Sequence, residues 1–275
     1  MMDAMPDKAA LLALYRAEPG RARPRTYLPG EVAGEGADAL AQVHARLAEL
    51  LPGGPLEVYE AGGGSTSYLP AEIAGRSRVT VVDTDPVQLA KNTYAAEKVL
   101  GDIQVQRFPA GSFDLVVCYN VIEHVPDVAA VFERFRACLR PGGVLLVGAP
   151  NPASLSGWVT RVTPHWFHVL YYRLIRGDRN AGRPGEAPFP VHYHPLVEPA
   201  ALRDHAALRG FEAAHFRLYE SPRYAELRGR WPGLARLVDL ATDGANRLLG
   251  GGRNLRHGDY HMILRRTAER SPSQG

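Results

Sequence analysis

The segment from Leu56 to Leu69 constrains the fold most, because a short apolar run there ends in an acid and is followed by three consecutive glycines. This pattern predicts a β-strand that ends at Glu60, a turn through Gly62 and Gly64, and then the start of a helix. Glycine lacks a Cβ and adopts positive φ at little cost, so a ligand can lie directly against such a backbone. The turn therefore predicts a binding site for a small, flat ligand.

Two classes of ligand use a glycine turn of this kind, and the neighbouring residues discriminate between them. A dinucleotide site requires G-x-G-x-x-G with the pyrophosphate at a helix N-terminus, but the last position of that pattern is Ser67. Glu60 would also place a carboxylate beside the diphosphate. S-adenosylmethionine has no phosphate and carries an ammonium and a sulfonium cation, so the same carboxylate would attract it. The turn favours S-adenosylmethionine over NAD.

Strand and helix patterns alternate after the turn. We expect strands at 79–83, 112–120 and 144–147, and helices from the turn to about 74, at 86–100 and at 127–139. The continuous β-branched run at 79–83 is typical of a strand buried on both faces of a parallel sheet, and the alternation implies right-handed crossovers. Asp83 ends that strand about 20 residues after the glycine turn, where an acid can accept hydrogen bonds from both ribose hydroxyls.

The chain of 275 residues is long enough to bury one core with insertions. Further helical patterns occur at 9–16, 37–51, 198–209 and 224–249, and further strand patterns at 211–220 and 260–265. We predict a single domain with an N-terminal helical arm (1–54), a cofactor-binding half (55–151) and two substrate-side insertions (152–195 and 221–253).

The composition restricts the setting of the protein. The net charge of +3, from 32 basic and 29 acidic residues, is too small to indicate a nucleic-acid partner. Cys118 and Cys138 lack metal-type spacing, so we expect buried, reduced thiols. The sequence has neither an apolar leader nor a run of about 18 apolar residues. We therefore expect a cytoplasmic protein.

The motifs between residues 55 and 151 together resemble those of class I S-adenosylmethionine-dependent methyltransferases. In chain order they are E-A-G-G-G at 60–64, V-D at 82–83, G-D at 101–102, S-F-D-L-V-V at 112–117, N-V-I-E-H-V-P-D at 120–127 and L-R-P-G-G at 139–143. They are most similar to the small-molecule branch that includes the ubiquinone and menaquinone biosynthesis methyltransferases. The third glycine of the usual E-x-G-x-G-x-G turn is Thr66 here, which is sterically acceptable if its φ is negative.

This resemblance implies an α/β, Rossmann-like fold, with a seven-stranded, mostly parallel sheet, helices on both faces and an inserted helical cap. It also implies how S-adenosylmethionine binds. Gly62 and Gly64 would face its methionine part, Glu60 would hold its ammonium directly or through water, and Asp83 would bind the ribose.

The same resemblance assigns roles to the next two loops. Asp102 would accept a proton of the adenine amino group, with Ile103 packed on the ring, and Asn120 would contact the ligand near the sulfonium. The alternatives are that Asp102 is a turn residue and that Asn120 caps a helix.

His124 is the best candidate for a general base, because it follows the fourth strand of the family core on the expected cofactor side. If the acceptor is a hydroxyl, such a base adds roughly 10²–10⁴ to the rate. The alternative is that Glu123 and His124 only stabilise the start of the next helix. Related quinone O-methyltransferases hold a divalent metal on E-x-x-E-H, but Asn120 replaces the first of these acids. We therefore expect no metal.

The segment 151–195 is inserted where the family core has one helix, and it is basic and aromatic. It holds five arginines against two acids, a surplus equal to the net charge of the whole chain. Beyond Pro164, an apolar helical face is predicted that includes Trp166, Phe167 and Leu170. Such a helix can lie on an anionic membrane surface, roof an apolar acceptor pocket or pack on its own domain.

We therefore expect methyl transfer to a small, apolar or lipid-like acceptor, O-directed rather than N-directed. Residues 156–176 would contact the inner face of a membrane peripherally. Nucleic-acid methylation is disfavoured, because amino-directed enzymes of this fold carry Asn/Asp-Pro-Pro-aromatic after the fourth strand and this chain has Asn120-Val121-Ile122-Glu123. The alternatives are a cofactor-binding scaffold without catalysis and an NAD-dependent oxidoreductase.

Overall fold

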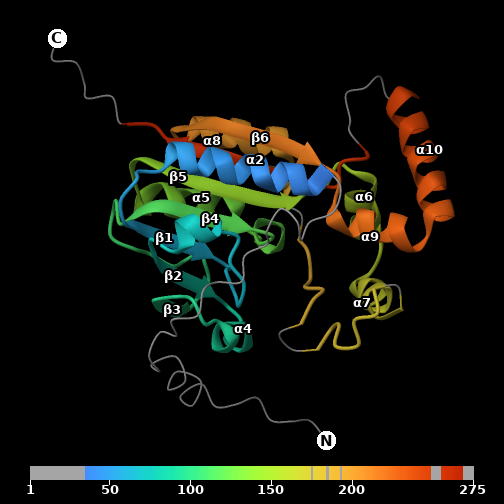
Figure 1. The fold of residues 1–275 in the computed structure, drawn as a ribbon, viewed down its shortest axis with the longest axis horizontal. Helices are drawn as coiled ribbons and strands as arrows, with labels where there is room; N and C mark the ends of the chain where they lie inside the picture. The colour runs from blue at the N-terminus through green and yellow to red at the C-terminus, as the bar shows by residue number, and fades with distance from the viewer. Residues whose placement is uncertain (1–34, 175, 184–185, 193, 249–254, 269–275) are drawn as a thin grey trace, which may run out of the picture.

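A computed structural model describes residues 35–174, 176–183, 186–192, 194–248 and 255–268. The predicted helix at 9–16 and most of the arm 1–54 lie outside these residues. The described chain forms a seven-stranded sheet in the order β3-β2-β1-β4-β5-β7-β6 (Figure 1). β1 to β5 pair in parallel, whereas β7 is antiparallel to β5 and β6. The predicted Rossmann-like, mostly parallel α/β sheet is confirmed.

The central strands are built from apolar, mostly β-branched residues that are buried on both faces. The strands are β1 (Leu56–Ala61), β2 (Ser77–Asp83), β3 (Glu97–Leu100), β4 (Phe113–Tyr119), β5 (Leu139–Pro150), β6 (Phe211–Tyr219) and β7 (Asp259–Arg266). Val58, Val81 and Val116 are fully buried, as expected for parallel strands covered by helices.

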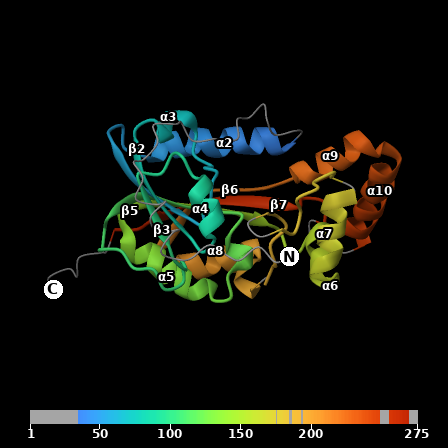
Figure 2. The same ribbon diagram turned by 90° about the horizontal axis from the view of Figure 1, so that it is seen from below.

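Helices cover both faces of the sheet (Figure 2). The helices on one face are α2 (Glu35–Leu50), α3 (Ala71–Ala74) and α4 (Pro86–Lys91), and those on the other are α5 (Val128–Cys138) and α8 (Pro199–Leu208). α2 buries Leu40, Val43 and Leu47 at helical spacing, and α5 buries Phe132 and Phe135. Burial of each such side chain contributes roughly 1.5–3 kcal/mol.

Four more helices form a cap beyond one end of the sheet (Figures 1 and 2). They are α6 (Leu155–Val162), α7 (His165–Leu174), α9 (Pro222–Arg230) and α10 (Pro232–Leu248). α6 follows the end of β5 and α9 follows the end of β6, so the cap lies at the carboxyl edge of the parallel strands. The inserted helical cap is confirmed, and the helical pattern at 224–249 forms two helices, α9 and α10, separated before Pro232.

The segment after the glycine turn differs from the prediction, because it stays extended until α3 begins at Ala71. The Ser67 hydroxyl donates to Glu60 and accepts the N–H of Leu69. Pro70 also disfavours helical geometry at the residue before it. These local interactions hold the chain away from the helix that the pattern predicted.

The predicted helix at 86–100 is wrong beyond Lys91, where α4 ends and the chain turns into the edge strand β3. Asn92 ends the helix. Its amide donates to the Gly64 carbonyl at 2.7 Å, and its Oδ1 accepts two backbone N–H groups, one of them from Tyr94 at 3.2 Å. Gly64 lies 28 residues away in the chain, so no local pattern could show this contact.

β5 begins at Leu139, earlier than the predicted strand at 144–147. Gly142 has φ +79, and the register between β4 and β5 shifts between Phe113 and Leu115. The Pro-Gly-Gly sequence therefore interrupts the pairing of the strand and does not end the strand.

Candidate active site

The strand order reverses between β1 and β4, and this point locates the site. β2 and β3 extend the sheet on one side of β1, whereas β4 and β5 extend it on the other. At such a switch the loops diverge and leave a crevice at the carboxyl ends of the strands. Glu60 and Gly62 lie at the end of β1, Asp83 ends β2, Asp102 follows β3 and Asn120 follows β4. The predicted cofactor residues therefore lie along one edge.

The turn after β1 requires glycine. Gly62 has φ +69 and Gly64 has φ +48. A Cβ at Gly62 would lie 2.5 Å from the side chain of Val121. The Gly62 N–H donates to the Val82 carbonyl at 2.7 Å, which ties the turn to the end of β2. Thr66 is not among the described residues with positive φ, so this departure from glycine adds no left-handed strain.

Glu60 is buried at the end of β1, and hydroxyl groups hold its carboxylate. Ser67 donates to one carboxylate oxygen and Tyr94 to the other. Burial raises the pKa of Glu60 to about 7, while the hydrogen bonds from Ser67 and Tyr94 lower it. The backbone N–H of Tyr68 also acts on this carboxylate, and at least one oxygen lone pair remains. The ionised group can therefore still attract an ammonium or a bridging water.

Asp83 connects the first two loops of the edge. Its Oδ2 accepts the N–H of Gly64 at 3.0 Å, and its Oδ1 accepts the N–H of Asp85 at 2.8 Å. Burial raises the pKa of Asp83, and these N–H groups lower it. A lone pair remains on each oxygen, which fits an acceptor for two ribose hydroxyls. The neighbouring Asp85 caps α4.

Asp102 and Ile103 lie in the turn after β3. Asp102 Oδ1 accepts the Gln104 N–H at 2.8 Å, and its Oδ2 accepts the Gln104 side-chain amide at 2.9 Å. Gln104 in turn accepts the N–H of Asp127, which links this loop to α5. Asp102 thus has the structural role of a turn residue. Its carboxylate oxygens also keep lone pairs that could accept a hydrogen bond from an adenine amino group. Ile103 is buried in the main core.

Asn120 has φ +55, the one non-glycine positive φ in the described part of the chain. Its N–H donates to the Gly148 carbonyl at 2.7 Å, and its side-chain amide donates to the Tyr68 hydroxyl at 2.8 Å. Val121 and Asp127, not Asn120, precede the two helices that follow. The capping alternative for Asn120 is therefore wrong. Asparagine adopts this left-handed conformation more readily than most non-glycine residues, so the turn after β4 forms here without glycine.

Tyrosines continue the edge away from Asn120. Tyr68 stacks on Tyr119 with ring centroids 4.2 Å apart, and the hydroxyls of Tyr119 and Tyr219 lie 2.8 Å apart. A Cβ at Gly148 would lie 2.3 Å from the Tyr119 ring, so only glycine leaves room for it. These rings form an aromatic floor between the end of β4 and the cap.

His124 lies in the short helix η2 (Ile122–His124), with 28% of its side chain exposed. Its Nδ1 lies 2.5 Å from the Pro190 carbonyl, which can only accept, so the proton is on Nδ1 and Nε2 keeps its lone pair. The Phe189 ring packs edge-on against the imidazole. Burial lowers the pKa of His124, whereas the bond to Pro190 raises it. A neutral imidazole with a free Nε2 has the form of a general base.

Glu123 is buried beside His124, with its Oε1 3.6 Å from the His124 Nε2. Its Oε2 has no hydrogen-bond partner within the described residues. Burial raises the pKa of Glu123 to about 8, which the Arg223 charge partly offsets. The carboxyl group is therefore mostly neutral at pH 7, and at 3.6 Å its Oε1 lies beyond hydrogen-bond distance of Nε2, so the His124 lone pair stays available.

Arg223, near the start of α9, completes the edge from the cap side. Its side chain is exposed, and the neighbouring Tyr172, Asp259 and Glu123 raise the pKa of its guanidinium. The sequence patterns did not indicate Arg223 or Asp259. Both lie far along the chain from Asn120, and the only local signal was the proline that begins α9.

Cys118 and Cys138 are buried free thiols, as predicted. Within the described ranges, no helix is long and apolar enough to cross a membrane. The same residues contain no group of three or more His, Cys, Asp or Glu side chains placed to hold a metal ion.

Comparison with known proteins agrees with this geometry. A family profile described as a methyltransferase domain matches residues 59–147. A ubiquinone biosynthesis O-methyltransferase of Xanthomonas axonopodis pv. citri is 32% identical over 51% of this chain and 67% of its own length. A nocamycin O-methyltransferase of Saccharothrix syringae is 30% identical over 63% of this chain and 71% of its own length. Further ubiquinone relatives are matched over only 58% of their length.

A solved structure shows the same fold. The S-adenosylmethionine-dependent methyltransferase from Methanosarcina mazei superposes with a TM-score of 0.50 at 18% identity, over 81% of this chain and 97% of that chain. The fold, together with the polar residues at the carboxyl ends of the parallel strands, thus defines a Rossmann-like nucleoside-binding enzyme. The chain belongs to the class I S-adenosylmethionine-dependent methyltransferases.

Proposed function

We propose that the protein transfers a methyl group from S-adenosylmethionine to an oxygen of a small, apolar or lipid-like acceptor. The observation that carries the proposal is that Glu60, Asp83 and Asn120 share one edge with the neutral His124. Transfer to oxygen, and not to nitrogen, is supported by the ubiquinone and nocamycin relatives, because both are O-methyltransferases.

The donor set of this chain fits S-adenosylmethionine. Glu60 offers a carboxylate to the ammonium, Asp83 offers two acceptor oxygens to the ribose, and Asp102 offers lone pairs to the adenine amino group. When bound, S-adenosylmethionine supplies a methyl group already activated by its positive sulfur. Asn120, held between Gly148 and Tyr68, lies where the methyl end would be.

The residues of the chain then have two tasks in catalysis. The first is alignment of the acceptor oxygen with the methyl group, which can supply roughly 7–11 kcal/mol. The second is removal of the acceptor hydroxyl proton, for which the His124 Nε2 is available. With the cofactor and a hydroxyl acceptor bound, His124 would take the hydroxyl proton as the methyl group is transferred.

A strap of residues 186–192 packs against His124 and covers part of its imidazole. At one end Glu186 pairs with Lys91 of α4 at 2.8 Å. At the other, Pro190 bonds the imidazole, and the His192 N–H donates to the Glu123 carbonyl at 2.9 Å. The strap therefore spans the edge from α4 to η2. Exclusion of water there strengthens every electrostatic interaction in the site.

The test is incubation of the protein with methyl-labelled S-adenosylmethionine and fractionated metabolites and lipids. We expect label in an organic-extractable fraction and release of S-adenosylhomocysteine. Binding of S-adenosylhomocysteine without transfer to any fraction would favour the non-catalytic scaffold. Tight binding of NAD instead would favour an oxidoreductase. Calorimetry with the three ligands distinguishes these outcomes.

We also propose that residues 156–176 rest on an anionic membrane surface, which would bring a lipid-like acceptor to the site. The apolar face of α7 points outward, with 65% of Trp166 and 66% of Leu174 exposed, while Tyr172 on the opposite face is buried. Trp158 of α6 is 57% exposed, and Arg161 lies in the last turn of the same helix. An exposed apolar face with basic neighbours is typical of interfacial helices.

Vesicle co-sedimentation tests this contact. We expect binding to vesicles containing phosphatidylglycerol and much weaker binding to phosphatidylcholine alone. The double variant Trp166→Ser/Leu174→Ser should weaken binding at least about tenfold, because each buried side chain contributes more than 1.4 kcal/mol. Val105→Ser, which changes a 69%-exposed side chain outside the cap, is the matched control. Equal and negligible binding to both vesicles would refute the proposal.

A further inference from the structure

A pocket of about 260 Å³ opens between α7 and α9, and its walls are basic and aromatic. The lining residues are Tyr171, Arg176, Arg223, Glu226, Leu227, Arg230 and Trp231. Arg176 is already engaged, because it pairs with Glu226 at 3.3 Å and covers the Tyr172 ring at 4.7 Å. Neither Arg223 nor Arg230 forms a hydrogen bond or a close ion pair with any described residue. The pocket thus holds guanidinium groups that are free to bind an anion.

Arg223 connects this pocket to the reaction edge, because it lies four residues after Tyr219, whose hydroxyl is 2.8 Å from that of Tyr119 at the end of β4. Tyr219 also pairs with Asp259 at the start of β7, and the Arg223 charge acts on Asp259 and on Glu123 and His124 in the loop after β4. Tyr68, which Asn120 holds, is also close enough to affect Arg223. An anion on Arg223 would therefore lie between the mouth of the pocket and the methyl end of the cofactor site.

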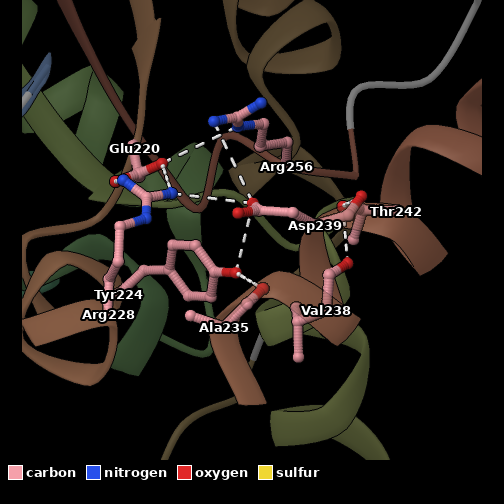
Figure 3. Close-up of polar contacts among 8 residues, drawn as sticks. All are labelled: Glu220, Tyr224, Arg228, Ala235, Val238, Asp239, Thr242 and Arg256. Carbon is pink, nitrogen blue, oxygen red and sulfur yellow. Dashed lines mark hydrogen bonds and ion pairs between the residues drawn. The ribbon is translucent and has the colours of Figure 1, made fainter. Parts of the chain in front are cut away.

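The structure holds the segment that carries Arg223 in place (Figure 3). Arg228, one turn and a half along α9, forms two 2.8 Å hydrogen bonds to the buried Glu220 at the end of β6. Arg228 also lies 3.6 Å from Asp239 of α10, whose Oδ1 accepts the Tyr224 hydroxyl at 3.2 Å. This network fixes α9 to the sheet and to α10. A preorganised binding group loses less conformational entropy when its ligand arrives.

The charges nearby limit the kind of anion that fits. The Asp259 carboxyl offsets part of the positive charge of Arg223. The site at Arg223 is therefore better suited to a ligand with one negative charge than to a doubly charged phosphate. A planar guanidinium matches the two oxygens of a carboxylate. Tyr171, Leu227 and Trp231 offer apolar surface in the same pocket. The surroundings therefore match a carboxylate attached to an apolar or aromatic body.

Building on the methyl transfer proposed above, we propose that the acceptor is an organic acid whose carboxylate is bound by Arg223. Its apolar body lies against Tyr171 and Trp231, and a separate hydroxyl of the same molecule reaches His124. Arg223 is then the residue that selects acidic acceptors over neutral ones of the same shape.

The direct test is binding of 4-nitrobenzoate, with 4-nitrobenzamide as the neutral probe of equal shape. Trp231 lines the pocket, so quenching of tryptophan fluorescence reports binding, and Trp231→Phe should remove most of the signal. We expect Arg223→Gln to weaken nitrobenzoate binding at least about tenfold and to leave nitrobenzamide binding unchanged. Arg223→Lys should retain part of the affinity for nitrobenzoate, because lysine keeps the positive charge but lacks the two parallel N–H groups of the guanidinium. Arg236→Gln, an exposed arginine of α10 outside the pocket, should change nothing.

The folding controls are the melting temperature and the affinity for S-adenosylhomocysteine, both of which should match the wild type in every variant. Equal binding of the two probes, or equal losses in Arg223→Gln and Arg236→Gln, would overturn the proposal. So would an Arg223→Gln variant that binds nitrobenzoate normally but no longer binds phosphatidylglycerol vesicles, since the anion would then be a lipid headgroup.

The two proposals fail in distinguishable ways. If nitrobenzoate binding depends on Arg223 but labelled methyl reaches no fraction, the anion site stands and the proposed function falls. If methyl is transferred and the accepting molecule is neutral, with Arg223→Gln fully active, the function stands and the anion site falls.

Discussion

His124→Gln is expected to lower the kcat of methyl transfer by roughly 10²–10⁴ and to leave the affinity for S-adenosylhomocysteine unchanged. The hydrogen bond from Nδ1 to the Pro190 carbonyl fixes the tautomer, so Nε2 is the atom that can take the acceptor proton. Glutamine is similar in size to histidine but cannot accept a proton near neutral pH. Initial rates of methyl incorporation into the accepting fraction, together with calorimetry, measure the two quantities.

The pH profile separates a chemical role for His124 from a packing role. Burial places the pKa of His124 below its usual value of 6.5, so the neutral base is present at pH 7 and is lost on acidification. The kcat of the wild type should therefore fall at acidic pH, and His124→Gln should lack that fall. Phe189→Leu, which removes the ring contact and keeps the imidazole, is the matched control. A glutamine variant with nearly normal kcat would assign His124 to packing under the strap alone.

The cofactor half was predictable because each of its signals is local. Glu60 and Asp83 end runs of apolar residues that can only be buried strands, and the glycines after Ala61 can adopt the positive φ that the turn has. In a parallel sheet, strand ends meet at one edge whatever the loops do. The positions of the strands in the sequence were therefore enough to place these residues together.

The parts that failed depend on contacts between distant residues. Asn92 ends α4 by bonding the Gly64 carbonyl, and β3 exists because it pairs with β2. The local sequence at 86–100 shows neither the bond to Gly64 nor the pairing with β2. Ser67 similarly uses its hydroxyl on Glu60, which keeps the next segment extended.

The acceptor side was the least predictable. The sequence showed a basic, aromatic insertion, but not that the apolar face of α7 points outward. It also could not show that β6 and β7 bring Arg223 and Asp259 to the edge beside Glu123. Those residues belong to three segments that only the strand order brings together.

Asp83→Ala is expected to weaken S-adenosylmethionine and S-adenosylhomocysteine binding about a hundredfold or more. Two hydrogen bonds from ribose hydroxyls to a carboxylate contribute about 1.5–3 kcal/mol each, and 1.4 kcal/mol corresponds to a factor of ten. The N–H groups of Gly64 and Asp85 also lose their acceptor, so the turn becomes less well defined. Calorimetry measures the affinity. Asp85→Ala is the matched control, since it removes a neighbouring carboxylate that only caps α4.

Asp83→Asn shows that this loss reflects ligand binding and not unfolding. Burial raises the pKa of Asp83, so the folded state favours the protonated carboxyl more than the unfolded chain does, and ionisation at pH 7 reduces stability. Asparagine removes the buried charge but keeps only one acceptor oxygen, so its NH2 group faces one of the two backbone N–H groups. These two effects oppose each other, so the melting temperature of the variant without ligand should stay close to that of the wild type, while its cofactor affinity falls at least about tenfold. A residue that served only the fold would lose both together, and that result would remove Asp83 from the cofactor site.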